Sequence, residues 1–136
     1  QEDVWGLFSG YLTDFLNRIN LSIFAYGETG SGKTYTMSYV TRRFLAELLS
    51  RRADYDRFEV SISMVEIDNE KIYCLLSEER RPLSIMNYHV KGARRAVVTT
   101  EGECDTVLTE CWKRRKTAAT DFNDVSSRSH AVCTIK

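Results

Sequence analysis

The sequence predicts an α/β fold in which helices flank a central β-sheet. Helical spacing of apolar residues alternates along the chain with short β-prone runs. One of these runs leads directly into a glycine-rich turn, after which a second helical pattern begins. Hydrophobic residues make up 43% and charged residues 28% of the 136 positions, which is typical of a globular protein and of one domain or a piece of one.

Charge and cysteine content exclude several functional classes. Lys+Arg and Asp+Glu both number 19, so the chain has no overall basic field for nucleic acid or a membrane surface. The four cysteines lack metal-ligand spacing, and we expect reduced thiols of a cytosolic protein rather than a zinc site or a disulfide framework. No apolar run approaches the ~18 residues of a membrane-spanning helix. We therefore expect no nucleic-acid partner and no membrane span.

The first half of the chain predicts a helix, a strand and a second helix. Apolar residues from Val4 to Ile19 recur at helical spacing, which predicts one amphipathic helix of about four to five turns. Residues 21–26 (LSIFAY) are apolar and β-prone and stop at a glycine, which indicates a buried strand. Helical spacing resumes from Lys33 to about Arg51.

The second half begins with a strand. Residues 58–67 alternate between apolar and polar side chains, which predicts a half-buried strand. A turn at 68–70 and a short apolar segment at 72–76 follow. Two β-prone runs, 83–85 and 96–100, predict a small hairpin.

The last part of the chain predicts a helix, a loop and a strand. Helical spacing covers 103–117 and ends in the basic run KRRK at 113–116, where cations suit the negative end of the helix dipole. Residues 118–128 are polar and indicate a loop. Residues 129–135 predict a final strand.

The strongest chemical motif is GETGSGKT at 27–34, which fits the P-loop pattern G-x-x-x-x-G-K-[ST]. Glycines allow backbone N–H groups to approach phosphate oxygens closely, and the helix N-terminus adds partial positive charge. Lys33 supplies a charge for the β- and γ-phosphates, and the Thr34 hydroxyl suits Mg²⁺. The alternative, a glycine-rich turn that only feeds a helix, gives no reason for the Lys-Thr pair. The fold class is therefore that of a P-loop NTPase.

A second polar cluster, NDVSSRSH at 123–130, places an amide, three hydroxyls, an arginine and a histidine in eight positions. Hydroxyls can reach Mg²⁺ or orient a water, and a guanidinium can hold a γ-phosphate or a carboxylate. Taken alone, the cluster is equally consistent with a polar cap before a strand. A guanine-reading N-K-x-D motif is missing from the sequence, which argues against a GTPase.

Together these motifs resemble the kinesin motor domain, over nearly all 136 residues and in the family's order. Residues 23–37 (IFAYGETGSGKTYTM) are similar to its P-loop, and 123–130 to its switch I motif N-x-x-S-S-R-S-H. Residues 64–76 (MVEIDNEKIYCLL), 1–4 (QEDV) and 90–92 (VKG) also have counterparts. The resemblance implies that residues 1–136 form a partial motor domain, namely its central portion, truncated at both ends.

The resemblance implies a role for each matching residue. Positions 27–34 would wrap the phosphates of ATP or ADP: Gly27, Glu28, Thr29, Gly30, Ser31, Gly32, Lys33 and Thr34. Tyr35 would lie beside the adenine. Thr34 and Ser127 would bind Mg²⁺, Asn123 and Ser126 would order the attacking water, and Arg128 would pair with a glutamate of switch II.

The resemblance also implies partners. The expected function is that of an ATPase whose turnover is stimulated by microtubules and coupled to movement along them, in the cytoplasm and on the cytoskeleton. A homodimer would form through regions outside this chain. Five basic residues fall where the family contacts acidic tubulin, although a solvated loop face explains them equally well: Arg80, Arg81, Lys91, Arg94 and Arg95. We interpret KRRK at 113–116 as a helix end rather than a docking site.

The sequence departs from the family pattern at several points. Glu28 stands where the family usually has Gln, and its charge should modestly weaken phosphate binding. The insert loop after Met37 is missing, so we expect an unbroken helix there. Neither a base-binding segment before the P-loop nor a switch II motif occurs, so turnover by the isolated chain is open. The alternative functions are a kinesin-like nucleotide- or microtubule-binding module without turnover, and an unrelated P-loop kinase or ATPase.

Overall fold

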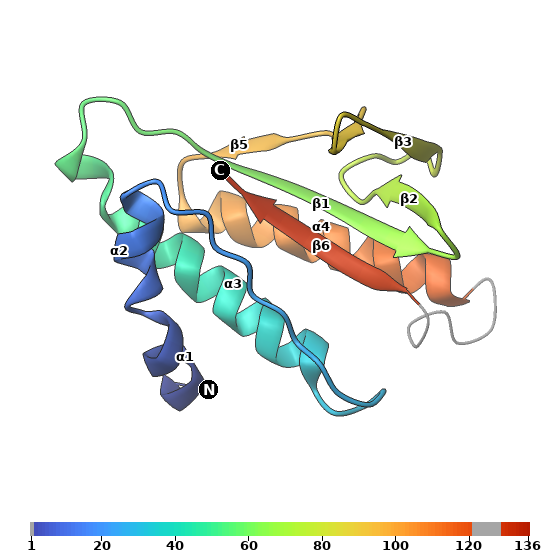
Figure 1. Ribbon diagram of the computed structural model, residues 1–136, viewed down its shortest axis with the longest axis horizontal. Coiled ribbons are helices and arrows are strands. Elements are labelled where there is room, and N and C mark those ends of the chain that lie inside the picture. The colour runs from blue at the N-terminus through green and yellow to red at the C-terminus, as the bar shows by residue number, and fades with distance from the viewer. Residues whose placement is uncertain (1, 121–128) are drawn as a thin grey trace. The chain divides into compact units, whose positions relative to one another are not determined.

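The computed structural model describes residues 2–120 and 129–136 (Figure 1). Contacts divide the chain into two compact units, residues 1–58 and 59–136. The first unit contains α1 (Glu2–Phe8), α2 (Tyr11–Leu16), α3 (Lys33–Ser50) and the short 3₁₀ turn η1 (Arg52–Asp54). The second contains β1 (Val60–Asp68), β2 (Lys71–Cys74), β3 (Pro82–Met86), β4 (His89–Lys91), β5 (Ala96–Val98), α4 (Glu101–Thr120) and β6 (His130–Ile135). None of the helices within these described residues is long and apolar enough to cross a membrane.

The first helical region consists of two helices, so the prediction of one continuous helix was wrong. The break falls at Ser9 and Gly10, where the Ser9 hydroxyl donates a hydrogen bond to the Gly6 carbonyl (3.3 Å). Glycine favours such a break because it loses more backbone entropy in a helix than any other residue. Trp5 remains buried and donates from Nε1 to Glu47 Oε1 (3.0 Å), which ties α1 to α3.

Helix α3 confirms the predicted helix after the glycine-rich turn, and it runs unbroken from Lys33 to Ser50. Its buried side chains are Val40, Phe44, Leu45 and Leu48, which follow helical spacing. Phe44 also meets Phe15 of α2 edge to face, with ring centroids 5.3 Å apart.

Residues 21–26 do not form the buried strand that their composition predicts. The backbone there has no regular structure, the Phe24 side chain is 88% exposed and Tyr26 is fully exposed. A β-strand depends on neighbouring strands that accept its hydrogen bonds. Among the residues that the structure describes, no strand pairs with this segment, which is the physical reason for the difference.

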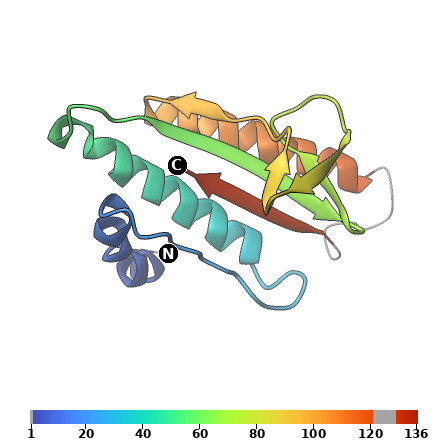
Figure 2. The same ribbon diagram turned by 45° about the horizontal axis from the view of Figure 1, so that its top comes forward.

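The second unit is built on β1, the long central strand of a six-stranded sheet in the order β4-β3-β2-β1-β5, with β6 also paired to β1 (Figure 2). All pairs are antiparallel. Along one edge, β1 pairs with β6 over residues 62–67. Along the other edge, it pairs with β5 near its start and with β2 near its end. β6 confirms the strand predicted at 129–135.

β1 is buried on both faces, so the prediction of a half-buried strand was too modest. The apolar side chains of Val60, Ile62 and Met64 are buried, as expected from the alternation. On the opposite face of the strand, Ser61 and Val65 are buried as well. The turn predicted at 68–70 is confirmed, because Asn69 and Glu70 adopt positive φ angles (47° and 63°) between β1 and β2.

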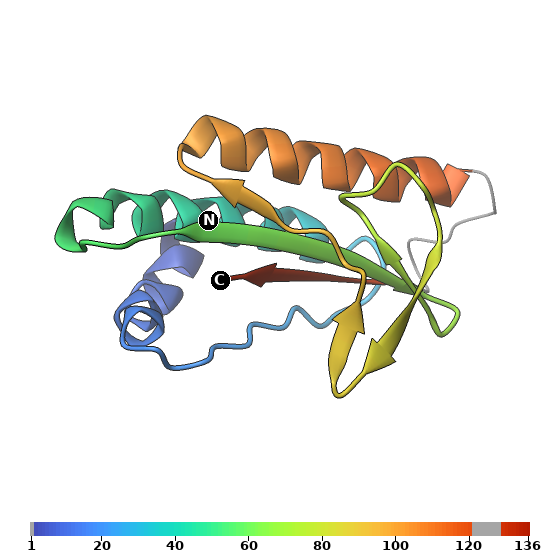
Figure 3. The same ribbon diagram turned by 90° about the horizontal axis from the view of Figure 1, so that it is seen from above.

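The predicted hairpin exists, but its two strands are β3 and β4 rather than 83–85 and 96–100. Asn87 and Tyr88 make the two-residue turn, with φ angles of 50° and 64°. Two positive φ angles match the type I′ turn that suits the twist of a tight hairpin. The segment 96–98 becomes β5 and pairs with β1 instead. The hairpin projects from the rest of the sheet (Figure 3).

Helix α4 covers one face of this sheet (Figure 3). It is longer than predicted at both ends, running from Glu101 to Thr120. Its start is capped: the Thr100 hydroxyl accepts a hydrogen bond from the Glu103 N–H (3.2 Å), and Glu103 accepts one from the Thr99 N–H (2.7 Å). Hydrogen bonds from Thr99, above all the one from its backbone N–H, lower the pKa of the Glu103 carboxyl group. Cys111 of this helix forms a buried cluster with Met64 of β1 and Leu75.

Candidate functional site

The glycine-rich loop ends at the N-terminus of α3 with an arrangement suited to anions. Gly32 is the N-cap residue, has a left-handed backbone (φ 86°) and makes no side-chain capping bond. The first N–H groups of a helix have no partner inside the helix, and here no side chain from the N-cap position satisfies them. These donors and the positive end of the helix dipole are therefore available to a phosphate group.

The loop approaches itself so closely that position 27 requires glycine. A Cβ atom built on Gly27 would lie 2.8 Å from Ser31 Oγ, and the φ angle of Gly27 is +154°. The Ser31 N–H donates to the Glu28 carbonyl (3.2 Å), which closes the turn. This tight winding is the reason for the spacing of glycines in the motif.

Lys33 places its ammonium group against the loop. Its Nζ donates to the carbonyl oxygens of Gly27 (2.7 Å) and Glu28 (2.6 Å). Within residues 2–120 and 129–136, no carboxylate forms an ion pair with Lys33. A positive charge that only carbonyl groups hold is well suited to a phosphate.

The remaining residues of the motif lie around this point, in the first unit. Glu28, Thr29, Gly30 and Ser31 are exposed in the loop. Thr34 is exposed in the first turn of α3, and the Tyr35 ring is 72% exposed beside it. The backbone donors, the Lys33 ammonium and the Thr34 hydroxyl are groups that fit a nucleotide phosphate with its Mg²⁺. The structure thus brings residues 27–35 together as one candidate site.

Four predicted site residues lie outside the described residues: Asn123, Ser126, Ser127 and Arg128. The residue that follows them, Ser129, is described and is buried immediately before β6. Its surroundings reveal a polar cluster in the second unit.

This polar cluster, which we call the Glu66 cluster, consists of Glu66, Arg80, Arg115 and Ser129. The Glu66 side chain in β1 is 1% exposed, and each of its two carboxylate oxygens accepts a hydrogen bond. Arg80 Nη1 donates to Glu66 Oε2 (3.0 Å), and the Ser129 hydroxyl donates to Glu66 Oε1 (2.9 Å). A buried carboxylate of this kind needs such partners, because an unpaired buried charge is very costly.

Arg115 of α4 completes the Glu66 cluster. Its Nη2 donates to both the carbonyl and the hydroxyl oxygen of Ser129 (3.1 and 3.2 Å). Its Nε lies 3.5 Å from Glu66 Oε1, close enough for an ion pair but without hydrogen-bond geometry, so this buried N–H has no hydrogen-bond partner. The cluster thereby fixes the backbone at position 129 to both β1 and α4.

The Glu66 cluster as a unit is not evident from the sequence. One signal was present, because Glu66 interrupts the apolar side chains of β1. A charged residue inside a buried strand indicates partners from elsewhere in the chain. Arg80 and Arg115 are distant in sequence, so only the fold identifies them as those partners.

The basic residues considered for tubulin contact fall into two groups. Arg80 is committed to Glu66, lies 3.6 Å from Asp68 and covers the Tyr73 ring at 4.1 Å. The other four are exposed around the β3–β4 hairpin: Arg81, Lys91, Arg94 and Arg95. Two arginines of the KRRK run stabilise the fold. Arg114 donates a hydrogen bond to the Leu75 carbonyl (3.0 Å), and Arg115 belongs to the Glu66 cluster.

The cysteines form no reactive centre in the described part of the chain. All four are free thiols, and no metal-binding group of His, Cys, Asp and Glu occurs among the described residues. Burial raises the pKa of Cys111 to about 11 and that of Cys133 to about 12. Both thiols are therefore protonated and poorly nucleophilic near neutral pH.

Comparisons with known proteins agree with the motifs. The family model of the kinesin motor domain matches residues 1–136. The chain is 38% identical to the kinesin-like protein tea2 of Schizosaccharomyces pombe over 143 residues, which is 95% of this chain and 22% of tea2. It is 40% identical to the kinesin-like protein KIN-7E of Arabidopsis thaliana over 121 residues, 84% of this chain and 14% of KIN-7E.

The fold agrees as well. The solved structure of a fast kinesin, described for its ATPase mechanism and its interactions with microtubules, superposes with a TM-score of 0.92 at 29% identity. The match covers 99% of this chain and 44% of that one, so the chain spans less than half of its structural relative. The unbroken family match, the relatives and the shared fold all show that this chain belongs to the kinesin motor domain family.

Proposed function

We propose that this chain is the nucleotide-binding portion of an ATP-dependent microtubule motor. The observation that carries the proposal is the uncapped N-terminus of α3, wrapped by a loop whose winding requires Gly27 and whose only cation is Lys33. ATP and ADP are the proposed ligands, at residues 27–35.

In this proposal the backbone N–H groups of residues 30–34 bind the β-phosphate region, and Lys33 exchanges its carbonyl partners for phosphate oxygens. The Thr34 hydroxyl is placed to hold Mg²⁺, which when bound neutralises developing charge on the phosphates. Tyr35 offers an exposed ring to the adenine.

Switch I supplies the second half of the proposed mechanism. Ser127 joins Thr34 at the metal, Asn123 and Ser126 orient the water, and Arg128 pairs with a switch II carboxylate. The Glu66 cluster supports this arrangement, because it holds Ser129, one residue after Arg128, to β1 and α4.

The proposed partner is the microtubule, approached through the exposed cations of the β3–β4 hairpin. An acidic tubulin surface would attract them, mainly by raising the association rate. This function places the protein in the cytoplasm on the cytoskeleton. A homodimer formed by other regions of the protein also belongs to the proposal.

ATP turnover by the intact protein, measured with and without microtubules, tests the proposal. We expect Lys33→Ala to abolish turnover, because the phosphates lose their cation. We expect Arg128→Ala to block hydrolysis while nucleotide still binds. Arg52→Ala, an exposed residue away from the loop, is the matched control. Microtubule-stimulated turnover that persists in the Arg128 variant would contradict the switch I assignment.

The alternative is a kinesin-like module that binds nucleotide or microtubules without turnover. Glu28 favours this possibility, since a carboxylate exposed in the phosphate loop repels the ligand. The same assay separates the two, because a module of this kind binds nucleotide or microtubules and releases no phosphate.

A further inference from the structure

We propose that Ser84 in β3 is a phosphorylation site for a serine/threonine kinase that recognises an arginine three residues before its target. The sequence around it is Arg80-Arg81-Pro82-Leu83-Ser84-Ile85, which places Arg81 at that position. A basic residue before the target serine fits the acidic substrate groove of such a kinase.

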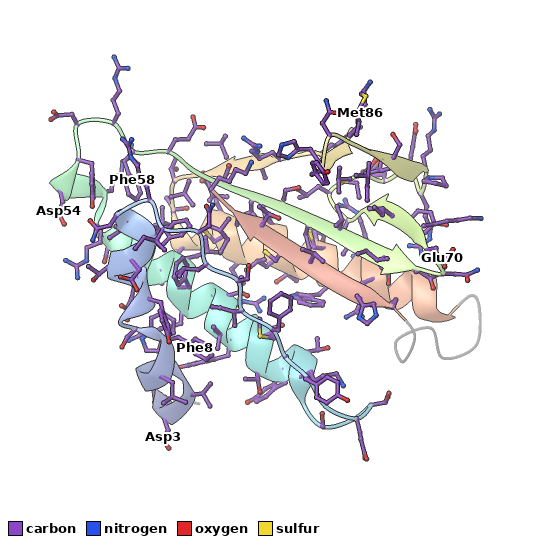
Figure 4. The ribbon with its side chains drawn as sticks, viewed as in Figure 1. Asp3, Phe8, Asp54, Phe58, Glu70 and Met86 are labelled. Carbon is purple, nitrogen blue, oxygen red and sulfur yellow. The ribbon has the colours of Figure 1, made fainter. Side chains whose placement is uncertain are left out.

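The structure makes Ser84 accessible. Ser84 is exposed, and the Arg81 side chain is 80% exposed although it pairs with Glu79 (2.8 Å). Ile85, the residue after the target, is also exposed. Figure 4 shows Met86 at the end of the same hairpin, with its side chain pointing away from the sheet.

One edge of this strand is also available, while the other edge pairs with β4. β2 pairs with Pro82 and Leu83 only, so in the part of the chain that the structure describes the edge of β3 facing β2 is free from Ser84 onward. A strand is extended backbone, the form in which a substrate segment lies in a kinase groove. The projecting hairpin therefore presents both the recognition arginine and the target hydroxyl (Figure 3).

A second arginine-containing motif in the chain provides a contrast. Arg114 and Arg115 precede Thr117 by three and two residues, which satisfies the same rule in the sequence. However, Thr117 lies within α4, so its backbone is helical. Arg114 is bonded to the Leu75 carbonyl, and Arg115 is held in the Glu66 cluster at 14% side-chain exposure. The fold thus selects Ser84 over Thr117.

The proposed reaction consumes ATP as co-substrate. The Ser84 Oγ attacks the γ-phosphorus, a new P–O bond forms, and the bond from the γ-phosphorus to the bridging oxygen breaks, which releases ADP. A base of the kinase takes the hydroxyl proton. The product carries about −1.5 to −2 charge at neutral pH.

The position of Ser84 predicts what this charge does. Ser84 lies directly opposite Lys91 in the β3–β4 ladder, so the phosphate would form an ion pair with its ammonium group. Apart from Arg80, which pairs with Glu66, the hairpin and its flanks expose four cations, and the phosphate would offset about half of their charge. We infer that phosphorylation weakens microtubule binding, an inference that rests on the proposed function.

The test uses the intact protein, ATP and the catalytic domain of calmodulin-dependent protein kinase II, with peptide mass mapping. We expect phosphate on Ser84 and not on Thr117. Arg81→Ala should slow the reaction about tenfold, the effect of one charge-assisted hydrogen bond. Arg57→Ala, an exposed arginine outside the hairpin, should leave the rate unchanged. An unmodified Ser84, an unaffected Arg81 variant or preferential modification of Thr117 would overturn the proposal.

Two further measurements separate the possible failures. A peptide of residues 76–92 measures recognition without the fold, and a peptide that is modified while the protein is not would refute the accessible hairpin. Microtubule co-sedimentation of phosphorylated and untreated protein then measures the consequence. We expect weaker binding after phosphorylation, by a margin that shrinks as salt is raised. Equal binding would overturn the inferred effect, whereas failure of the untreated protein to bind would instead contradict the proposed function.

Discussion

Two apolar, β-prone segments of similar character have opposite fates in this structure. Residues 60–68 become β1, which is hydrogen-bonded along both edges and buried on both faces. Residues 21–26 remain without regular structure and expose Phe24 and Tyr26. Each run is connected with a site: β1 contains Glu66 of the Glu66 cluster, and residues 21–26 directly precede the phosphate loop. The comparison shows that β propensity describes a fit to neighbouring strands rather than a property of the segment alone.

The difference also separates two ways of building a site. The Glu66 cluster depends on tertiary structure, because its members come from β1, α4, the residue before β6 and the segment before β3. The phosphate loop is local, because Gly27, Ser31 and Lys33 determine one another's positions within seven residues. Substitutions should therefore damage the fold mainly through the first site and damage ligand binding mainly through the second.

The largest expected effect is that of Glu66→Ala. Removing the carboxylate leaves Arg115 buried with its charge uncompensated, and breaking a buried pair in this way costs about 3–5 kcal/mol. The free energy of unfolding, measured by urea denaturation, checks this expectation. Glu59→Ala is the matched control, since Glu59 precedes the same strand and is exposed. A loss below about 1 kcal/mol would show that the cluster does not hold the second unit together.

A second pair of variants compares the two segments directly. Ile62→Ala in β1 removes a fully buried side chain and should cost about 2–5 kcal/mol. Phe24→Ala in 21–26 removes an exposed one and should change stability by about 0.5 kcal/mol or less. Denaturation of the 136-residue chain measures both. A large cost for Phe24→Ala would show that another strand covers the segment, and would overturn the contrast.

A small effect, on ligand binding rather than on stability, is expected for Glu28→Gln in the local site. This change removes a carboxylate beside the proposed phosphates, and at surface dielectric the repulsion amounts to about 0.5–1 kcal/mol. We expect ATP to bind a few-fold more tightly, as measured by isothermal titration. Glu2→Gln, a change of the same kind away from the loop, should have no effect on affinity. Unchanged affinity in the Glu28 variant would show that its carboxylate does not sense the ligand.

Local features of the fold could be predicted from the sequence, and pairing features could not. The unbroken helix after Met37, the turn at 68–70 and the strand at the end of the chain all follow from spacing and turn chemistry. Three predictions failed because they needed tertiary knowledge or missed a local signal. The strand at 21–26 lacked a partner, 96–98 paired with β1 instead of 83–85, and Gly10 divided the first helix.

The candidate site divides in the same way. Residues 27–34 could be identified from the motif, since the physics of phosphate binding dictates consecutive residue types. The pairing of Arg80 with Glu66 could not be predicted, because a basic residue before a hairpin looks the same in sequence whether or not it reaches a buried carboxylate. The predictions for Asn123, Ser126, Ser127 and Arg128 lie outside the described residues and remain predictions.

The central claim is that the loop at Lys33 and the hydroxyls before His130 act on one Mg²⁺-bound triphosphate. A double-mutant cycle with Thr34→Ala and Ser127→Ala, measured as the affinity of the intact protein for a magnesium complex of a non-hydrolysable ATP analogue, tests it most directly. If both hydroxyls ligate the same ion, the double variant should lose clearly less affinity than the two single losses added together. Losses that add to within about 0.5 kcal/mol would place the two groups at separate sites and contradict the account.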